Sequence, residues 1–301
     1  MYKKIIFWGT PEFSLPSLKI LYKLDLIKII ITQPDKLGGR NKKLIISPIK
    51  DYALKHNLNL LQPNKLDDNF IKELKKYLPA TFVVIAYGKI IPKKILDLSE
   101  LQTINIHPSK LPLLRGPSPI QTALFKGFNS TAVSLMQIDD KMDHGPILEH
   151  IKVNIDKKDN YTSLNNKLSK ISAKLLKNNI LNYLNNKLKS KEQDHSKATF
   201  CKMIKKEDGN INWNNNAEKI YNQVRALNPW PSTFTKINNL DIKILKVILS
   251  NKELKVSKIL IEKDKLYIGT NTRALEILKV QIPGKKIIEV KDFLKGYKNR
   301  L

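Results

Sequence analysis

The chain has 301 residues, one cysteine and a formal net charge of +27. This length buries a sizeable core and favours two domains, while the single cysteine excludes an internal disulfide and a cysteine-rich metal site. No stretch is long and apolar enough to span a membrane, and the N-terminus lacks the pattern of a secretory or transit signal. We therefore expect a cytoplasmic protein without a membrane partner.

The positive charge permits a polyanion partner, because clustered cations bind phosphate backbones. Only five of the 54 basic residues are arginines, and lysine, asparagine and isoleucine are abundant throughout, as expected from an AT-biased coding sequence. Positive charge is in excess on both sides of residue 200. Charge alone therefore localises no binding face.

The first part of the chain predicts strands that alternate with helices. Expected strands lie at residues 4–8, 27–32, 82–86, 103–106 and 132–138. Expected helices open near Ser14 and cover residues 48–56, 69–77 and 163–188. This alternation predicts an α/β domain with a Rossmann-like, mostly parallel sheet over residues 1–189, with ligands beyond the carboxyl ends of the strands. Only Gly9 stands where a dinucleotide fingerprint would need several glycines, which argues against NAD.

The sequence changes character after the long helix. Residues 187–196 are polar, lysine-rich and free of periodicity, and we interpret residues 190–206 as a linker. A helix is expected at 217–227, followed by short strands at 233–235, 242–249, 256–261, 266–268 and 275–282. Residues 207–301 are therefore predicted to form a smaller, separate β-barrel or sandwich domain.

Three polar residues are candidates for catalysis. Asn105 and His107 lie two residues apart at the end of a predicted strand, so their side chains share one face of the sheet. Asp143 follows the next predicted strand and, in a parallel sheet, reaches the same edge. An amide and an imidazolium stabilise a developing oxyanion while a carboxylate sets the proton state of the imidazole, which suits acyl-type transfer to an amine.

Each of these residues also has a simpler interpretation. A lone asparagine, histidine or aspartate in a loop is more often a turn or capping residue than a catalyst. Ser109 lacks the glycine-flanked turn of a hydrolase nucleophile. The spacing of His107, His144 and His150 is not that of a metal site, so we expect no metal.

Several motifs together carry a resemblance to a known family. They are Phe7–Phe13, Gln33–Asp35, Gly39–Lys43, Asn105–Ile120, Asp143–Gly145 and Arg225–Pro231. Over nearly the whole chain the sequence resembles the folate-dependent formyltransferases, which move a formyl group from 10-formyltetrahydrofolate to an amine. Leu114 stands where that family usually has an aromatic residue, and His144 replaces a small one.

The resemblance implies roles for individual residues. Asn105 and protonated His107 would hold the oxyanion formed when the amine attacks the formyl carbon, and Asp143 would support proton transfer. The folate cosubstrate would contact a segment made of Ser109, Lys110, Leu111 and Pro112, and Tyr87 and Gly88 would line its pocket.

The resemblance also implies an acceptor. Residues 33–44 match a basic loop that enters the acceptor stem of tRNA, with Arg40, Lys42 and Lys43 as contacts, and the second domain matches an OB-like barrel that holds the tRNA backbone. The expected acceptor is thus the α-amino group of methionine on initiator methionyl-tRNA, used in translation initiation by a monomeric enzyme.

Alternatives remain open at this point. Relatives that formylate glycinamide ribonucleotide or a UDP-linked amino sugar share the three catalytic residues, as does the hydrolase part of formyltetrahydrofolate dehydrogenase. The three residues therefore fix the chemistry and not the acceptor, and the basic loop, second domain and charge favour tRNA. An RNA-binding protein on an inactive scaffold would not require all three.

Overall fold

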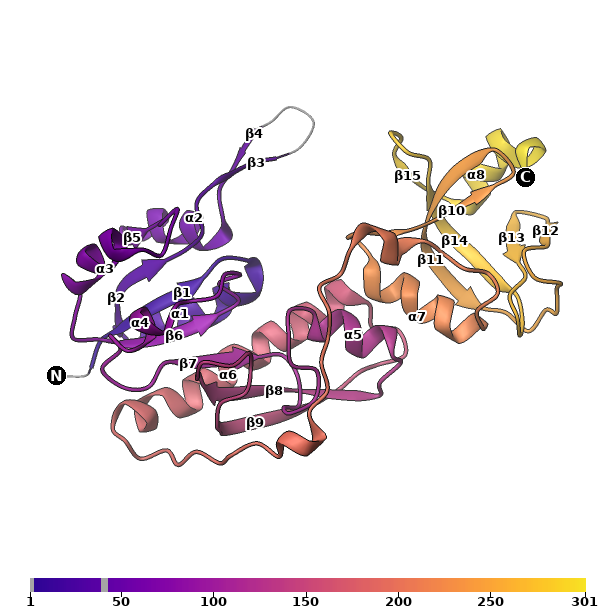
Figure 1. Ribbon diagram of the computed structural model, residues 1–301. Coiled ribbons are helices and arrows are strands. Elements are labelled where there is room, and N and C mark those ends of the chain that lie inside the picture. The colour runs from indigo at the N-terminus through magenta and orange to yellow at the C-terminus, as the bar shows by residue number, and fades with distance from the viewer. Residues whose placement is uncertain (1–2, 39–42) are drawn as a thin grey trace. The chain divides into compact units, whose positions relative to one another are not determined.

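The computed structural model describes residues 3–38 and 43–301 (Figure 1). The chain forms two compact units, which we describe separately. As far as it is described, the first holds residues up to Gly116, Thr131–Val153 and Asn165–Phe200. The second holds Pro117–Ser130, Asn154–Leu164 and Cys201–Leu301. The domain boundary expected at residues 190–206 stays a prediction.

The first unit is built on a sheet whose described strands follow the order β5-β2-β1-β6-β7-β8-β9. These strands are β1 (Ile5–Gly9), β2 (Ile27–Ile31), β5 (Leu60–Leu61), β6 (Thr81–Ile85), β7 (Ile104–His107), β8 (Ser130–Gln137) and β9 (Ile147–Asn154). The pairs from β5 to β7 are parallel, whereas β8 runs antiparallel to β7. The predicted mostly parallel α/β sheet is confirmed.

Several short helices, one hairpin and the long α6, whose first residues belong to the second unit, complete this part of the chain. They are α1 (Leu15–Lys23), α2 (Pro48–Lys55), α3 (Asp68–Lys75), α4 (Lys93–Leu96), α6 (Tyr161–Leu184) and the hairpin strands β3 (Lys36–Gly38) and β4 (Lys43–Ile45). Helix α2 begins where Ser47 accepts a hydrogen bond from Lys50 N, and α3 begins where Asp67 accepts one from Phe70 N. Within the described residues, we find no helix with the length and apolar character needed to cross a membrane.

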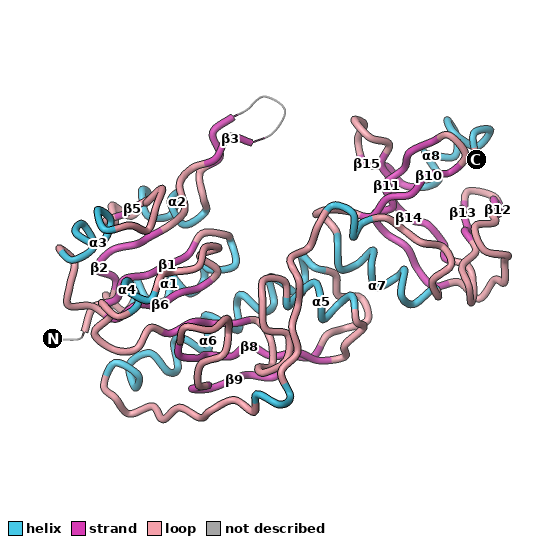
Figure 2. Tube along the Cα trace, viewed as in Figure 1, coloured by secondary structure: helices cyan, strands magenta, loops and turns pink. Residues whose placement is uncertain are grey.

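The core explains why the central strands carry so few polar residues. Every residue of β1 and β6 is buried, because helices cover both faces of a parallel sheet (Figure 2). Trp8 packs edge-on against Phe70 and Tyr87 and tilted against Phe82. This aromatic cluster anchors α3 and the loop after β6 to one face of the sheet.

The order of the strands places a topological switch point, where a ligand crevice is expected, at the carboxyl ends of β1 and β6. From β1 the chain adds β2 and β5 on one side, and then crosses to β6 and β7 on the other. The ends of β1 and β6 are neighbours, with Gly9 paired to Ile85. In open α/β sheets ligands bind outside the carboxyl ends of the strands at such a switch point. The loops that follow Gly9 and Ile85 are therefore the walls of the expected pocket.

The second unit contains an antiparallel sheet of order β10-β11-β14-β13-β12, with β15 paired to β14. Its elements are β10 (Thr233–Ile237), β11 (Leu240–Leu249), β12 (Ile259–Glu262), β13 (Lys265–Ile268), β14 (Leu275–Gln281), β15 (Ile287–Glu289), α5 (Pro119–Phe125), α7 (Ala217–Leu227) and α8 (Val290–Tyr297). Helix α7 packs on α5 and β11, and α8 on β14. The core includes the fully buried Leu266 and Phe293. A small β domain after the catalytic part is confirmed.

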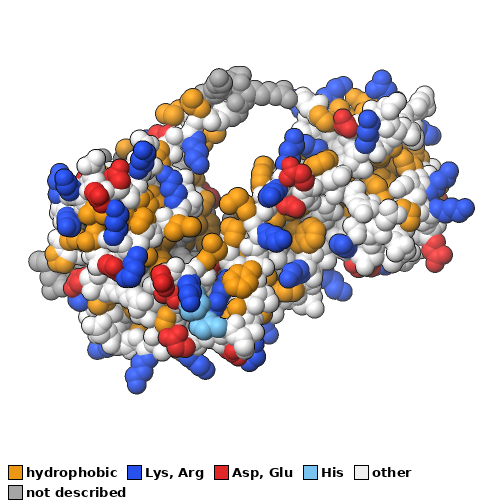
Figure 3. Space-filling model, viewed as in Figure 1, with side chains coloured by type: hydrophobic (Ala, Val, Ile, Leu, Met, Phe, Trp, Pro, Cys, Tyr) orange, Lys and Arg blue, Asp and Glu red, His pale blue; other side chains and the backbone are white. Residues whose placement is uncertain are grey.

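Basic side chains do not gather in one place on the face drawn in Figure 3. They are spread over the surface with acidic and apolar side chains between them. This agrees with the sequence, in which charge alone pointed to no binding face.

Replacing Ile6 with alanine should lower the free energy of unfolding by about 2–5 kcal/mol, because the side chain fills the centre of the sheet and leaves a cavity. Ile6 has no exposed surface, whereas Ile90 is 84% exposed. Ile90→Ala is the matched control and should change stability by about 0.5 kcal/mol or less. Equilibrium urea denaturation of the two variants checks this, and equal effects would contradict the packing described.

Candidate active site

Strand β7 places two of the three candidate residues on one face. Asn105 pairs with Val84 on one side and with Met136 on the other, and His107 pairs with Ser134. Since side chains alternate along a strand, Asn105 and His107 project from the same face while Ile104 and Ile106 project from the other. Asn105 is half-buried, and within the described residues its amide makes no hydrogen bond, so its donors are available to a ligand.

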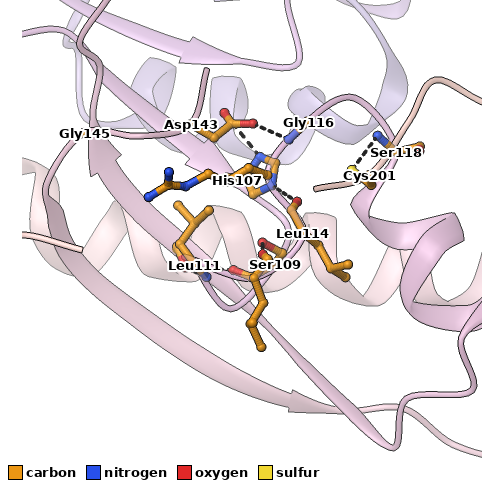
Figure 4. Close-up of polar contacts among 12 residues, drawn as sticks. His107, Ser109, Leu111, Leu114, Gly116, Ser118, Asp143, Gly145 and Cys201 are labelled. Atoms are coloured by element: carbon orange, nitrogen blue, oxygen red, sulfur yellow. Dashed lines mark hydrogen bonds and ion pairs between the residues drawn. The ribbon is translucent and has the colours of Figure 1, made fainter. Parts of the chain in front are cut away.

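The His107 imidazole lies between two oxygen atoms (Figure 4). Its side chain is buried, Nε2 lies 2.9 Å from Leu114 O, and Nδ1 lies 3.6 Å from Asp143 Oδ1. Because a carbonyl oxygen only accepts, Nε2 carries a proton and donates to Leu114 O. A second proton on Nδ1 would face the Asp143 carboxylate. The ring thus lies between an accepting carbonyl and a carboxylate.

Asp143 reaches His107 by a different path from the one expected. The prediction that a parallel strand delivers Asp143 to this edge is wrong, because β8 is antiparallel to β7 and Gln137 pairs with Ile104 at the start of β7. The loop of residues 138–146 therefore begins at the opposite end of β7 from His107. It folds back over the sheet face to bring the Asp143 carboxylate to the imidazole.

This loop holds Asp143 in an unusual conformation. Asp143 has φ +50°, a left-handed geometry that costs a residue with a Cβ about 1–2 kcal/mol. Gly116 N donates a 2.8 Å hydrogen bond to Asp143 Oδ2. Two residues later, a Cβ on Gly145 would overlap the backbone oxygen of Gln137, so only glycine fits there. The Asp-x-Gly spacing seen in the sequence is thus a requirement of the loop.

Gln193 is a site residue that the sequence did not predict. Its Nε2 donates to Asp143 O at 2.9 Å and to Gly145 O at 2.7 Å, and its Oε1 accepts from Arg115 Nε at 3.2 Å and from an Arg115 terminal nitrogen at 2.7 Å. It lies in the stretch interpreted as a linker, where Lys191 forms a bridge with Ile147. A lone glutamine in a polar, non-periodic stretch gives no signal from which this role could be found.

Arg115 is buried beside the loop. Burial lowers the pKa of its guanidinium, and the charges of Asp143 and Asp139 oppose that change. The guanidinium also lies 2.8 Å from His195 Nδ1, and the His195 ring stacks on His144 with centroids 3.9 Å apart. His144, a departure from the family pattern, thus contacts His195 and, through Nδ1, the Asp139 carboxylate at 2.6 Å.

The predicted folate segment follows β7 directly. Ser109 is buried, and its hydroxyl donates to Leu113 O at 2.6 Å while its carbonyl accepts from Ser134 Oγ at 2.7 Å. Lys110 is exposed, Leu111 is buried and Pro112 is half-buried. The Ser109 hydroxyl therefore shapes the turn, and folate contact by this segment stays a prediction.

Tyr87 and Gly88 lie at the switch-point crevice. Tyr87 O accepts hydrogen bonds from Thr10 Oγ1 at 2.9 Å and from Gln33 Nε2 at 2.7 Å, which tie the loops after β1 and β6 together. Gly88 has φ +84°, and a Cβ there would stand 2.6 Å from Gln33 Nε2. Burial raises the pKa of Tyr87 to about 12, and its hydroxyl has no partner within the described residues. Thr10 was not among the predicted site residues.

The basic loop is only partly described. Arg40, Lys42 and the side chain of Lys43 lie outside the described residues. At its base, Asp35 accepts a hydrogen bond from Gln62 Nε2 at 3.0 Å and pairs with Lys50, and these contacts, the Gln62 bond first, lower the Asp35 pKa. The hairpin β3–β4 is therefore anchored to the first unit by a charged hydrogen-bond network.

No group of three histidine, cysteine, aspartate or glutamate side chains that could hold a metal ion is found in residues 3–38 and 43–301. The first unit does assemble the half-buried side-chain amide of Asn105, the His107 imidazole and the Asp143 carboxylate on one face of the sheet. These groups can stabilise negative charge on a carbonyl oxygen and accept or donate a proton, without a nucleophile from the protein.

Comparison with known proteins agrees with this chemistry. Residues 4–180 match the model of the formyl transferase family, and residues 203–298 match that of the formyl transferase C-terminal domain. The methionyl-tRNA formyltransferase of Thermodesulfovibrio yellowstonii is 42% identical over 300 residues, covering 99% of this chain and 97% of the relative. That of Bacillus subtilis is 35% identical, covering 97% and 94%.

Solved structures share the fold at lower identity. The sugar 3N-formyl transferase WlaRD, crystallised with dTDP and 5-N-formyl-THF, has a TM-score of 0.70 and 23% identity, covering 95% of this chain and all of the other. HypX from Aquifex aeolicus, crystallised with tetrahydrofolic acid, has a TM-score of 0.67 and 14% identity, covering 99% of this chain and 48% of HypX. From the two family models and the full-length relatives, the chain belongs to the formyl transferase family, among the methionyl-tRNA formyltransferases.

Proposed function

We propose that this protein transfers the formyl group of 10-formyltetrahydrofolate to the α-amino group of methionine on initiator methionyl-tRNA, in the cytoplasm and as a monomer. The observation that carries the chemistry is the contact of His107 with Asp143, on the sheet face that also presents Asn105. Membership of a family whose full-length relatives act on methionyl-tRNA supports the choice of acceptor.

The residues of the crevice fit a folate. The loops after β1, β2 and β6 meet through Thr10, Gln33 and Tyr87, and a side chain at position 88 would collide with the Gln33 amide. The Tyr87 ring is buried against Trp8, and its hydroxyl has no partner within the described residues. The folate, when bound, supplies an electrophilic formyl carbon. We propose that Tyr87, Gly88 and the backbone of the segment 109–112 hold it.

Each catalytic group then has a distinct task. The amide of Asn105 donates a hydrogen bond to the formyl oxygen as negative charge develops there, and the positive charge of protonated His107 stabilises the same oxygen. A direct hydrogen bond from His107 Nε2 would replace its bond to Leu114 O. Asp143 accepts the proton that the attacking amine loses, and the proton passes to the departing nitrogen of the donor. A bond from nitrogen to the formyl carbon forms while the bond to the donor nitrogen breaks.

The acceptor is the part of the proposal that needs the most direct test. A UDP-linked amino sugar is the strongest alternative, because sugar N-formyltransferases share the fold. The basic loop of residues 33–44 and the appended β domain favour tRNA. Formyl transfer should be measured with methionine-charged initiator tRNA, charged elongator tRNA and a UDP-amino sugar. We expect initiator tRNA to be used best, and equal or better use of the sugar would overturn the choice.

Asn105→Ala should lower kcat by about 100-fold or more, because the loss of one oxyanion donor is expressed in the transition state. His107→Ala should have an effect at least as large. Binding of tRNA should stay near the wild-type level in both, as measured by filter binding at fixed salt. Retained turnover in either variant would refute the assigned role.

Arg40→Ala should impair the use of tRNA far more than the binding of folate. We expect the KM for methionyl-tRNA to rise by about tenfold, since one arginine contact to a nucleic acid contributes about 1–3 kcal/mol. The control is Lys75→Ala, which removes an exposed cation from the last turn of α3 in the first unit. Comparable losses in tRNA use and folate binding would mean that the loop shapes the folate pocket instead.

A further inference from the structure

We propose that Gln193 is a positioning residue for formyl transfer: its buried amide fixes Asp143 and the 114–116 segment on either side of His107. A test of this role by enzyme activity rests on the proposed function, whereas a test by the structure around the His107 ring does not. The hydrogen bonds of Gln193 go to the backbone carbonyls of Asp143 and Gly145 and to the Arg115 guanidinium, so it acts through the segments that contact the imidazole.

The first step is that Gln193 has no spare hydrogen-bonding capacity. Its side chain is about 5% exposed. Both amide protons are given to the carbonyls of Asp143 and Gly145, and the amide oxygen accepts twice from Arg115. A primary amide offers two donors and two acceptor positions. Every hydrogen-bond donor and acceptor of the Gln193 amide is therefore used, which holds the buried side chain in one orientation.

The second step concerns the loop that carries Asp143. This loop leaves the sheet at the far end of β7 and returns along the face, so strand pairing does not determine where Asp143 arrives. Asp143 also has a left-handed backbone, which persists only where surrounding contacts hold it. The two bonds from Gln193 grip the carbonyls on both sides of His144 and hold the loop in that shape.

The third step concerns the segment on the other side of the imidazole. Arg115, held by the Gln193 oxygen, lies between Leu114, whose carbonyl accepts from His107 Nε2, and Gly116, whose N–H donates to the Asp143 carboxylate. One side chain therefore connects both segments that contact His107. Glutamate would keep the acceptors but lose the donors, and methionine would keep the length but lose both.

The second unit offers a matched control. Gln223 is about 6% exposed, and its Nε2 donates to Asp208 O at 2.8 Å and to Asn210 O at 2.9 Å. The two glutamines thus bind the carbonyls of residues i and i+2 in the same way. Gln223 makes its contacts outside the unit that carries Asn105, His107 and Asp143.

The experiment compares Gln193→Met, Gln193→Glu and Gln223→Met in the full chain. With methionyl-tRNA and formyl donor saturating, both Gln193 variants should lose about 10- to 100-fold in kcat, with each KM within about threefold of wild type, because misplaced catalytic groups reduce the chemical step. Gln223→Met should keep wild-type kcat even if it lowers the free energy of unfolding by as much as the Gln193 variants do. Wild-type kcat in Gln193→Glu would overturn the proposal.

A second measurement separates this inference from the proposed function. The ¹⁵N resonances of the His107 ring, assigned with His107→Gln, report which ring nitrogens carry protons and what they contact. The chemical shifts of these ring nitrogens should change in Gln193→Glu and should remain those of wild type in Gln223→Met. If wild type failed to formylate any acceptor, the proposed function would fail while the ring spectrum still decided the role of Gln193. An unchanged ring spectrum would refute it.

Discussion

The antiparallel pairing of β8 with β7 is the constraint on which the rest of the site depends. A parallel β8 would have ended beside His107 and delivered its following loop there directly. Because Gln137 instead pairs with Ile104, the loop has to cross the sheet face to reach the imidazole. The returning loop has few strand hydrogen bonds of its own, and its position comes from side chains and from Gly116. Precision at Asp143 is thus supplied by tertiary hydrogen bonds.

Two parts of the sheet edge are built in different ways: the switch point between β1 and β6, and the groups at the end of β7. Strand order puts the switch point between β1 and β6, and the side chains of Thr10 and Gln33 hold the loop after β6 there through Tyr87 O. The groups at the end of β7 depend on contacts between distant segments, from residues 107 to 193. The expected ligand crevice thus lies at the ends of neighbouring parallel strands, whereas the contact between His107 and Asp143 depends on a loop that strand pairing does not place.

Much of the fold could be predicted from the residues themselves. Buried strands such as β1, β2 and β6 are continuous apolar runs, and α2, α3 and α7 follow the periodicity of amphipathic helices. Strand β9 was missed because it has exposed residues in the middle, and β5 because it has only two residues. The direction of β8 relative to β7 could not be predicted either, since the local sequence pattern does not encode whether a strand runs parallel to its neighbour. Asn105 and His107 were found because both lie on one strand, whereas Gln193 acts through backbone carbonyls, which leave no mark on sequence.

Helix α5 limits how the chain can be divided into separate parts. Pro119–Phe125 lie within the stretch expected as the first domain, yet the helix packs on α7 of the second unit, with Ala123 and Leu124 fully buried. Severing the chain near residue 190 would uncover this apolar helix on one fragment and its partner on the other. The C-terminal part therefore cannot be exchanged freely. A different C-terminal domain could be joined to the N-terminal part only if it supplied a helix that packs on α5 as α7 does.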